Sequence, residues 1–353
     1  MIKQFEPIRR LKDAWAVFKA VRKGNLGPGK ICSDLEEEIK KITHAKYCLT
    51  TTSGTVGLMM AIEALNLPKG STILFPAYTF LAGANAARFM GYKVKLVDIN
   101  YRTLCMDKDL FYYALKNTRN ISCAIFVNHN AYCGNDITEI KETCDRFNVP
   151  LIEDSCQSIG VKKSGKTGKI GVYSFSVPKL VTGGQGGGII TDDPKLAEKL
   201  ARIRDHGDNW REDRIHKHIG INLRYNDIQA SYVLSQLKDI KKLLTKRWQI
   251  CYEYNRYINV EGFYADTMSN DTPWMIIYRS KNADQIIEEL NKKGICAVKY
   301  YRAINENPPY RTKAKYPIAE RISKELIYLP SSLSLKKRQI RKICKIILKV
   351  EKE

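Results

Sequence analysis

GVYSFSVPKLVTGGQGGG occupies residues Gly171–Gly188 and places a lysine between an aromatic, strand-like segment and a run of glycines. Five glycines within six residues remove side chains where a chain must turn tightly or lie against a bound group. The apolar pair Ile189–Ile190 then resumes a strand. Taken alone, the stretch is equally compatible with a glycine-rich hairpin that carries a solvated lysine. Its meaning depends on what the rest of the chain places beside Lys179.

The composition is that of an ordinary globular protein, but the charges are not balanced. The 353 residues are 44% hydrophobic and 27% charged, and 59 Lys and Arg against 37 Asp and Glu give a net charge of +22. Such a field favours anionic partners, either nucleic acid or small phosphorylated substrates. The cations are scattered and form no interleaved basic and aromatic stripe, so we expect no nucleic-acid partner.

Cysteine and histidine usage points away from metal sites and disulfides. The ten cysteines form no C-x-x-C pair, which argues against a zinc ribbon or a compact disulfide framework. His216 and His218 lack a second cluster of ligands, so we expect no metal site. The amino terminus is too polar for a signal peptide, and no apolar run reaches about 18 residues. We therefore expect a cytoplasmic protein with reduced thiols and no membrane partner.

Short apolar runs alternate with helix-like segments between residues 45 and 190. This alternation predicts an α/β fold with a mainly parallel sheet that is covered by helices on both faces. The expected strands include 45–51, 72–76, 93–98, 122–127 and 150–154, with helices over 56–65, 81–90, 108–116 and 137–146. Functional residues in such sheets gather at the carboxyl ends of the strands. The candidates that follow directly on apolar runs are Phe80, Asp154, Gln157, Ser174 and Lys179.

The turn TSGTVG at residues 52–57 joins the first expected strand to a helix. This arrangement puts the backbone N–H groups of Gly54 and Thr55 at a helix amino terminus, which is a ready-made phosphate site. The alternative is a plain capping turn. No lysine follows as in a Walker A motif, so a nucleotide triphosphatase is disfavoured.

Asp154 ends an apolar strand and precedes Gln157 by three residues. A carboxylate in so apolar a context is costly unless something cationic meets it, although it would also suit a helix cap over 155–160. A phosphate-binding turn, an aromatic residue, a strand-end aspartate, a hydroxyl and a lysine are together what pyridoxal phosphate requires. The lysine forms a Schiff base with this cofactor, and the aspartate makes the ring an electron sink.

With these motifs in order, the sequence resembles the DegT/StrS-type sugar aminotransferases, which are fold-type I pyridoxal-phosphate enzymes acting on nucleotide-linked keto sugars. The resemblance covers nearly the whole chain and rests on Ser53–Thr55, Tyr78–Phe80, Glu153–Gln157, Ser174–Lys179, Gly183–Gly187, Gly220–Arg224 and Asp227–Ala230. It implies a large cofactor-binding domain (residues 1–240) with a seven-stranded, mainly parallel sheet. A long connecting helix and a small α+β domain would follow (residues 241–353).

The resemblance also implies roles for residues at matching positions. Lys179 would carry the cofactor and move the proton of the reaction. Asp154 would pair with the ring nitrogen, Gln157 would lie near the ring hydroxyl, and Phe80 would stack on the ring. The residues that would hold the phosphate are Gly54, Thr55 and Ser174.

Asn222 would reach the phosphate bound by a neighbouring subunit, which implies a homodimer with shared active sites. Arg224 and Gln185 are candidates for substrate contacts, and Gln185 stands where this family usually has glutamate. The segment NAYCGND at residues 130–136 departs from the family's usual His-Leu-Tyr-Gly pattern, and no role is assigned to the nearby His129. Lys179 excludes the dehydratases of this family that carry histidine at that position.

We therefore expect an aminotransferase that aminates a nucleotide-linked 4-keto-6-deoxyhexose with L-glutamate. The product would be a 4-amino-4,6-dideoxy sugar nucleotide for polysaccharide biosynthesis. The alternatives are an aminotransferase acting at C3 of a 3-keto sugar, a lysine-retaining sugar dehydratase, and a non-catalytic regulatory relative. Outside the sheet we expect helices over 8–23, 33–41, 237–257, 283–293 and 335–349, and strands at 274–278 and 297–301.

Overall fold

A seven-stranded sheet forms the centre of the molecule. The computed structural model describes residues 1–207, 215–261 and 272–353. The strands lie in the order β1-β7-β6-β5-β4-β2-β3, and all are parallel except β7, which runs antiparallel to both β1 and β6. The expected mainly parallel sheet is thus confirmed. Its strands are β1 (Tyr47–Thr51), β2 (Thr72–Pro76), β3 (Lys93–Val97), β4 (Ile121–Val127), β5 (Leu151–Asp154), β6 (Ile170–Ser174) and β7 (Gly187–Thr191).

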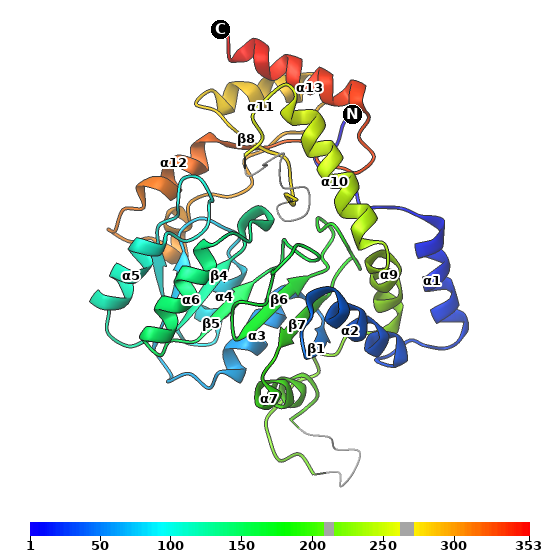
Figure 1. The fold of residues 1–353 in the computed structure, drawn as a ribbon, viewed down its shortest axis with the longest axis vertical. Helices are drawn as coiled ribbons and strands as arrows, with labels where there is room; N and C mark the ends of the chain where they lie inside the picture. Colours follow the sequence, from blue (N-terminus) through cyan, green and yellow to red (C-terminus); the bar gives the residue numbers. More distant parts are fainter. Residues whose placement is uncertain (208–214, 262–271) are drawn as a thin grey trace.

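Helices cover both faces of this sheet (Figure 1). Because successive strand residues point to opposite faces, Leu74 packs in one hydrophobic cluster and its neighbours Ile73 and Phe75 in another. The Leu74 side is covered by α5 (Lys108–Asn117) and α6 (Asp136–Arg146). On the Phe75 side lie α3 (Gly54–Ala64), α4 (Ala82–Phe89) and α7 (Pro194–Arg204). Both faces of the sheet are therefore buried against helices. A site for a ligand is left to the ends of the strands.

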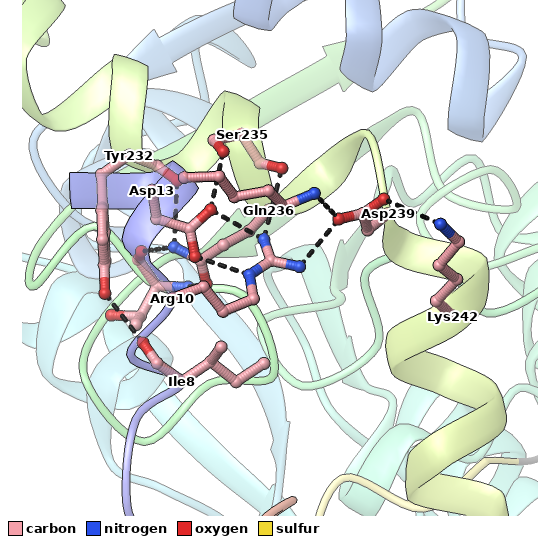
Figure 2. Close-up of polar contacts among 10 residues, drawn as sticks. Ile8, Arg10, Asp13, Tyr232, Ser235, Gln236, Asp239 and Lys242 are labelled. Carbon is pink, nitrogen blue, oxygen red and sulfur yellow. Dashed lines mark hydrogen bonds and ion pairs between the residues drawn. The ribbon is translucent and has the colours of Figure 1, made fainter. Parts of the chain in front are cut away.

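The first helix is attached by a polar cluster rather than by its apolar face. Helix α1 (Leu11–Arg22) packs on α9 (Asp227–Leu237), where the guanidinium of Arg10 binds both oxygens of buried Asp13 at 2.7 and 2.8 Å and also binds Asp239 (Figure 2). Ser235 donates a hydrogen bond to the same Asp13 carboxylate. The helical period puts Leu11, Trp15, Phe18 and Val21 on one face, and these side chains are exposed, Leu11 by 92%.

The carboxyl-terminal part of the chain begins with α10 (Ile240–Asn255), which runs from α9 to the group formed by α11 (Ala283–Lys292) and α13 (Lys337–Val350) (Figure 1). Strands β8 (Ile277–Arg279) and β9 (Leu326–Tyr328) pair antiparallel, and α12 (Pro317–Glu325) precedes β9. A domain boundary at residues 240/241 stays a prediction. None of the helices in the described residues is long and apolar enough to cross a membrane.

Two predictions for this part are wrong. The strand expected over 297–301 makes only an isolated bridge, from Val298 to Tyr328. The helix expected over 237–257 is interrupted at 238–239, between α9 and α10. At this break the carboxylate of Asp239 accepts a hydrogen bond from Arg10, which ties the turn between the two helices to the residue before α1.

Candidate active site

The candidate site lies where β1, β5 and β6 end and β7 begins. Because β7 runs antiparallel between β1 and β6, its first residue, Gly187, pairs with both Thr51 and Ser174. A Cβ at Gly187 would lie 2.8 Å from the carbonyl group of Ser53, so a side chain at this position would displace the backbone. The glycine run therefore allows the ends of β1 and β6 to meet.

Gly184 and Gly186 turn the chain between Lys179 and β7. Their φ angles of 77° and 129° lie in a region that residues with a Cβ rarely adopt. The turn is fixed from outside, because the hydroxyl of Tyr225 donates a 2.7 Å hydrogen bond to the carbonyl of Gln185. The side chain of Gln185 is exposed.

Gly54 begins α3 and lies against Ser174. A Cβ at Gly54 would lie 2.9 Å from the Cβ of Ser174, so this contact requires glycine. The Oγ of Ser53 caps the helix by accepting from the backbone N–H of Val56 at 3.2 Å. The first N–H groups of α3, those of Gly54 and exposed Thr55, have no acceptor within the helix.

Ser174 completes this helix terminus. Its Oγ accepts a 3.3 Å hydrogen bond from the backbone N–H of Ser176, a residue that sequence reasoning missed. Backbone donors, a helix dipole and hydroxyl groups converge here, which is the chemistry that binds a phosphate. The structure thus brings together the three residues predicted for this purpose.

Lys179 follows β6 and interacts electrostatically with Asp154 at the end of β5. Burial lowers the pKa of the Lys179 ammonium, while the neighbouring Cys156 and Asp154 oppose that change. Burial likewise raises the pKa of the Asp154 carboxyl, against a hydrogen bond from Cys156 N at 3.1 Å and the charge of Lys179. No helix covers 155–160, so the alternative interpretation of Asp154 as a helix cap is wrong. The thiol of Cys156 lies beside Gly54, another contact that sequence reasoning missed.

Gln157 is buried, and the oxygen of its side-chain amide accepts a hydrogen bond. Its Oε1 accepts a 2.6 Å hydrogen bond from the backbone N–H of Asn130 in η1 (His129–Ala131), the 3₁₀ turn after β4. This contact orients the amide so that its NH₂ group is the end that can donate to another acceptor.

Aromatic side chains form one wall of the site. Tyr78 and Tyr301 pack at 5.9 Å between ring centroids, and Phe80 lies 6.2 Å from Tyr301 with 59% of its side chain exposed. Trp274 extends the wall, with Lys179 Nζ 4.2 Å from the centroid of its ring. Phe80 is therefore beside the site with an exposed ring, as stacking on a bound group requires.

His129 is buried behind these rings. Its Nε2 lies 3.2 Å from the hydroxyl of Tyr328, and its Nδ1 has no partner among the described residues. Burial, followed by the charge of Lys179, lowers the pKa of this imidazole to about 3. Tyr328 and Trp274 lie far along the chain and carry no local motif, so no signal in the sequence points to them.

Asn222 and Arg224 are not joined to Lys179, Asp154 or Ser174 by any hydrogen bond or ion pair within the described residues. Arg224 instead donates to the side chain of Asn222 at 3.1 Å and pairs with Asp205 at 3.3 Å. The segment still borders the turn at residues 52–57 that leads into α3, because the hydroxyl of Thr51 donates to the carbonyl of Leu223. The roles predicted for Asn222, Arg224 and Gln185 stay predictions.

Comparison with known proteins agrees with this arrangement. UDP-2-acetamido-2-deoxy-3-oxo-D-glucuronate aminotransferase from Pseudomonas aeruginosa is 28% identical over 349 residues, with 95% of each chain covered. GDP-perosamine synthase from Escherichia coli O157:H7 is 28% identical over 330 residues, with 90% of each chain covered. Both relatives are thus matched over nearly their full length.

Solved structures share the fold. The aminotransferase TlmJ from Streptoalloteichus hindustanus matches with a TM-score of 0.92 over 99% of both chains at 23% identity. PseC from Helicobacter pylori, an aminotransferase, matches with a TM-score of 0.88 over 99% of this chain and 98% of the other at 24% identity. A sequence profile of the DegT/DnrJ/EryC1/StrS aminotransferase family matches residues 9–348. The chain therefore belongs to the DegT/DnrJ/EryC1/StrS aminotransferase family.

Proposed function

We propose that the protein is a pyridoxal-phosphate-dependent aminotransferase that transfers the amino group of L-glutamate to C4 of a nucleotide-linked 4-keto-6-deoxyhexose. The observation that carries this proposal is that Gly54 lies against both Cys156, two residues after the end of β5, and Ser174, the last residue of β6. Lys179, which follows β6, interacts electrostatically with Asp154 and Cys156. An amine, a carboxylate and a helix amino terminus that could bind a phosphate thus lie at one edge of the sheet.

The residues present fit this cofactor. The absent Cβ of Gly54 keeps the start of α3 against Ser174, where N–H and O–H donors would bind the phosphate. Asp154 is a buried acceptor that would bind the protonated ring nitrogen, and Gln157 presents an NH₂ group that would reach the ring hydroxyl. When bound, the cofactor supplies an electron sink that stabilises negative charge on the substrate carbon.

Lys179 would do the covalent and proton-transfer work. Its lowered pKa increases the fraction of neutral amine near pH 7, and only the neutral amine can attack a carbonyl or accept a proton. Cys156 and Asp154 limit how far that pKa falls. The aromatic wall would exclude water from the site while the proton moves.

The experiment that tests this proposal is borohydride reduction of the protein loaded with pyridoxal phosphate, followed by mass spectrometry of the peptide that carries Lys179. The cofactor mass should be attached to Lys179 in the wild type and absent in Lys179→Ala. The exposed Lys169→Ala is the matched control and should keep both the label and the activity. Amination by Lys179→Ala should fall by about 10²–10⁴-fold or more. An unlabelled wild-type Lys179 would favour the non-catalytic alternative.

A second candidate function is amination at C3. It is favoured by the P. aeruginosa relative, whose name specifies a 3-oxo sugar, whereas a Saccharopolyspora spinosa relative, 24% identical over 369 residues, is named as a 4-aminotransferase of a 4-dehydro sugar. Incubation with glutamate and nucleotide-linked 3-keto and 4-keto sugars, read by mass spectrometry and NMR, would separate the two. A dehydratase would instead leave the cofactor unconverted by glutamate in a single turnover.

The chain is also proposed to act as a homodimer with shared sites. The segment that carries Asn222 exposes three isoleucines: Ile215, Ile219 and Ile221. Exposed aliphatic side chains grouped around a residue predicted to reach a neighbouring subunit are typical of a protein–protein contact. This exposure supports the dimer.

A further inference from the structure

Trp274 reaches the candidate site from the carboxyl-terminal part of the chain. Its side chain is 3% exposed, and the ammonium nitrogen of Lys179 lies 4.2 Å from the centroid of its ring. A cation within about 6 Å of an indole face is attracted by the negative charge of that face, and the attraction is stronger when water is excluded. Trp274 is therefore an electrostatic partner of Lys179 as well as a packing residue.

The indole is held in place by hydrogen bonds at its ring and its backbone. Its Nε1 donates to the carbonyl of Pro178 at 2.6 Å, directly before Lys179 in the chain. Its backbone N–H donates to the carbonyl of Asn130 at 3.1 Å, and the Asn130 side chain exchanges two hydrogen bonds with the backbone of Met275. The ring is therefore anchored both to the lysine's own loop and to the turn after β4.

Asn130 links this anchor to the rest of the site. It has a φ of 50°, a left-handed conformation that asparagine tolerates better than most residues. In that conformation its N–H donates to Gln157, while its carbonyl and side chain bind the 274–275 segment. Asn130 thus orients both Gln157 and Trp274. This gives a structural role to one residue of the segment 130–136, which departs from the family pattern.

We propose that Trp274 is a positioning residue that holds the Lys179 amine at the ends of the strands whenever the lysine is not covalently engaged. A lysine side chain has four rotatable bonds and would otherwise sample many positions. The inference rests on the proposed function, because that chemistry requires Lys179 to be released and recaptured in every cycle.

An indole face suits this purpose better than a second carboxylate would. The groups that act on the charge of Lys179 are Asp154 and Cys156, and Lys179 in turn acts on His129. A further anion would keep the amine protonated. It would also compete with Asp154 for the positive charge that Asp154 is proposed to bind. A neutral π face gives weaker attraction without a net charge, so the amine can still lose its proton.

Competitive acetylation of the cofactor-free, full-length protein tests this inference. The labelling of Lys179 is followed by mass spectrometry as a function of pH in wild type, Trp274→Phe and Trp274→Leu. Because the indole favours the protonated amine, the pKa of Lys179 should fall in the order wild type, Phe variant, Leu variant, by about half a pH unit or more at the end of the series. Trp248→Leu is the matched control, since Trp248 stacks on Tyr252 in α10, and it should leave the titration unchanged.

Two outcomes would overturn the inference: a Leu variant that titrates like the wild type, or a Trp248→Leu variant that shifts Lys179 as much. The Phe variant keeps an aromatic ring and decides the question if the Leu variant does not fold. In the loaded enzyme, Trp274→Leu should lower kcat more than it raises KM for the sugar nucleotide. Because the acetylation needs neither cofactor nor sugar, it tests the contact between Trp274 and Lys179 even if the proposed function is wrong.

Discussion

His129 is an imidazole held neutral by its surroundings. It is 1% exposed, it packs against Tyr78 and Tyr301, it contacts the hydroxyl of Tyr328, and it lies within the electrostatic reach of Lys179. A second positive charge beside the lysine would be unfavourable, and burial adds to that cost. The low pKa of about 3 therefore keeps His129 from competing with Lys179 for a proton at neutral pH.

This histidine should make stability depend on pH. Between about pH 6.5 and pH 3 the unfolded chain binds a proton at His129 that the folded chain does not, so stability is lost as the pH falls through this window. By pH 4.5 the loss should reach roughly 2–3 kcal/mol. Urea unfolding of wild type and His129→Gln at several pH values measures it, because the glutamine variant should lack this part of the slope.

The exposed His44 provides the control for that experiment. His44 ends α2 (Lys30–Thr43) in a left-handed conformation, which asparagine also adopts, so His44→Asn should follow the wild-type profile. Parallel profiles for wild type and His129→Gln would contradict the assignment of the slope to His129.

Sequence reasoning could find some residues of the site but not others. Asp154 and Ser174 end strands, and Gly54 and Lys179 follow strands. Because parallel strands bring their carboxyl ends to one edge, local pattern and topology suffice to group them. Trp274 and His129 depend on how side chains pack between parts of the chain that are 145 residues apart in sequence, the separation of Asn130 and Met275. No periodicity encodes such a contact.

At the scale of elements, the start of α2 shows how a distant residue sets a helix boundary. The carboxylate of Asp227, buried at the start of α9, accepts hydrogen bonds from the backbone N–H groups of Gly29 at 3.1 Å, Ile31 at 3.3 Å and Cys32 at 2.8 Å. These are orphan donors of the first turn, and a negative charge at that terminus also suits the helix dipole. One side chain thus caps α2 and joins it to α9.

Removing this cap should destabilise the protein. Asp227→Ala leaves the buried N–H of Cys32 and the part-buried N–H groups of Gly29 and Ile31 without this acceptor, and we expect a loss of about 2–3 kcal/mol in the free energy of unfolding. Asp193→Ala is the matched control, since Asp193 caps α7 through two hydrogen bonds at an exposed site, and its loss should be about 1 kcal/mol. Urea denaturation measures both, and equal losses would argue against a special role for the buried carboxylate.

The same contact explains a wrong helix boundary. The sequence predicts that the second helix starts at residue 33, whereas α2 begins at Lys30. The cap is supplied by Asp227, which is 198 residues from Gly29, so no local pattern marks the true start. The sequence predicts the strands of the sheet and the helices between them closely, because the patterns of apolar residues that mark them are periodic and local.

At the scale of the whole molecule, the proposed dimer makes a prediction about mixed subunits. If Asn222 serves the partner's site, a heterodimer of Lys179→Ala and Asn222→Ala subunits contains one site with both residues intact. Each variant alone should be weak, the Asn222→Ala homodimer binding the cofactor about 10–100-fold less tightly because one phosphate contact is lost. Because random reassociation of an equal mixture gives half heterodimers, each with one of its two sites intact, mixing should restore close to a quarter of the wild-type activity.

The measurement is activity after the two variants are unfolded, mixed and refolded, with each variant refolded alone as the control. If Asn222 acted within its own subunit, the heterodimer would have one site without Lys179 and one without Asn222, so mixing would restore nothing. Sedimentation of the wild type should show a dimer, and a monomer at micromolar concentration would contradict the proposal.

The alternation of strands and helices was enough to predict the α/β sheet, because burial on both faces demands apolar strands joined by amphipathic helices. It did not predict that the apolar stripe of α1 points outward. Leu11 and Trp15 obey the helical period, but buried Asp13 and its partner Arg10 fix which side of the helix meets α9 (Figure 2). Periodicity gives the stripe, and only the tertiary contacts give its direction.

The aromatic wall has a consequence for truncated or nicked chains. Lys179, Asp154 and Ser174 all precede residue 180, but Trp274, Tyr301 and Tyr328 follow residue 271. A chain cut beyond α10 would keep every residue that bonds the cofactor in the proposed function and still lose Trp274, Tyr301 and Tyr328 from the aromatic side chains around the site. Retention of the cofactor during purification is therefore a sensitive measure of whether the carboxyl-terminal third is intact and folded, since a ligand stabilises only the state that can bind it.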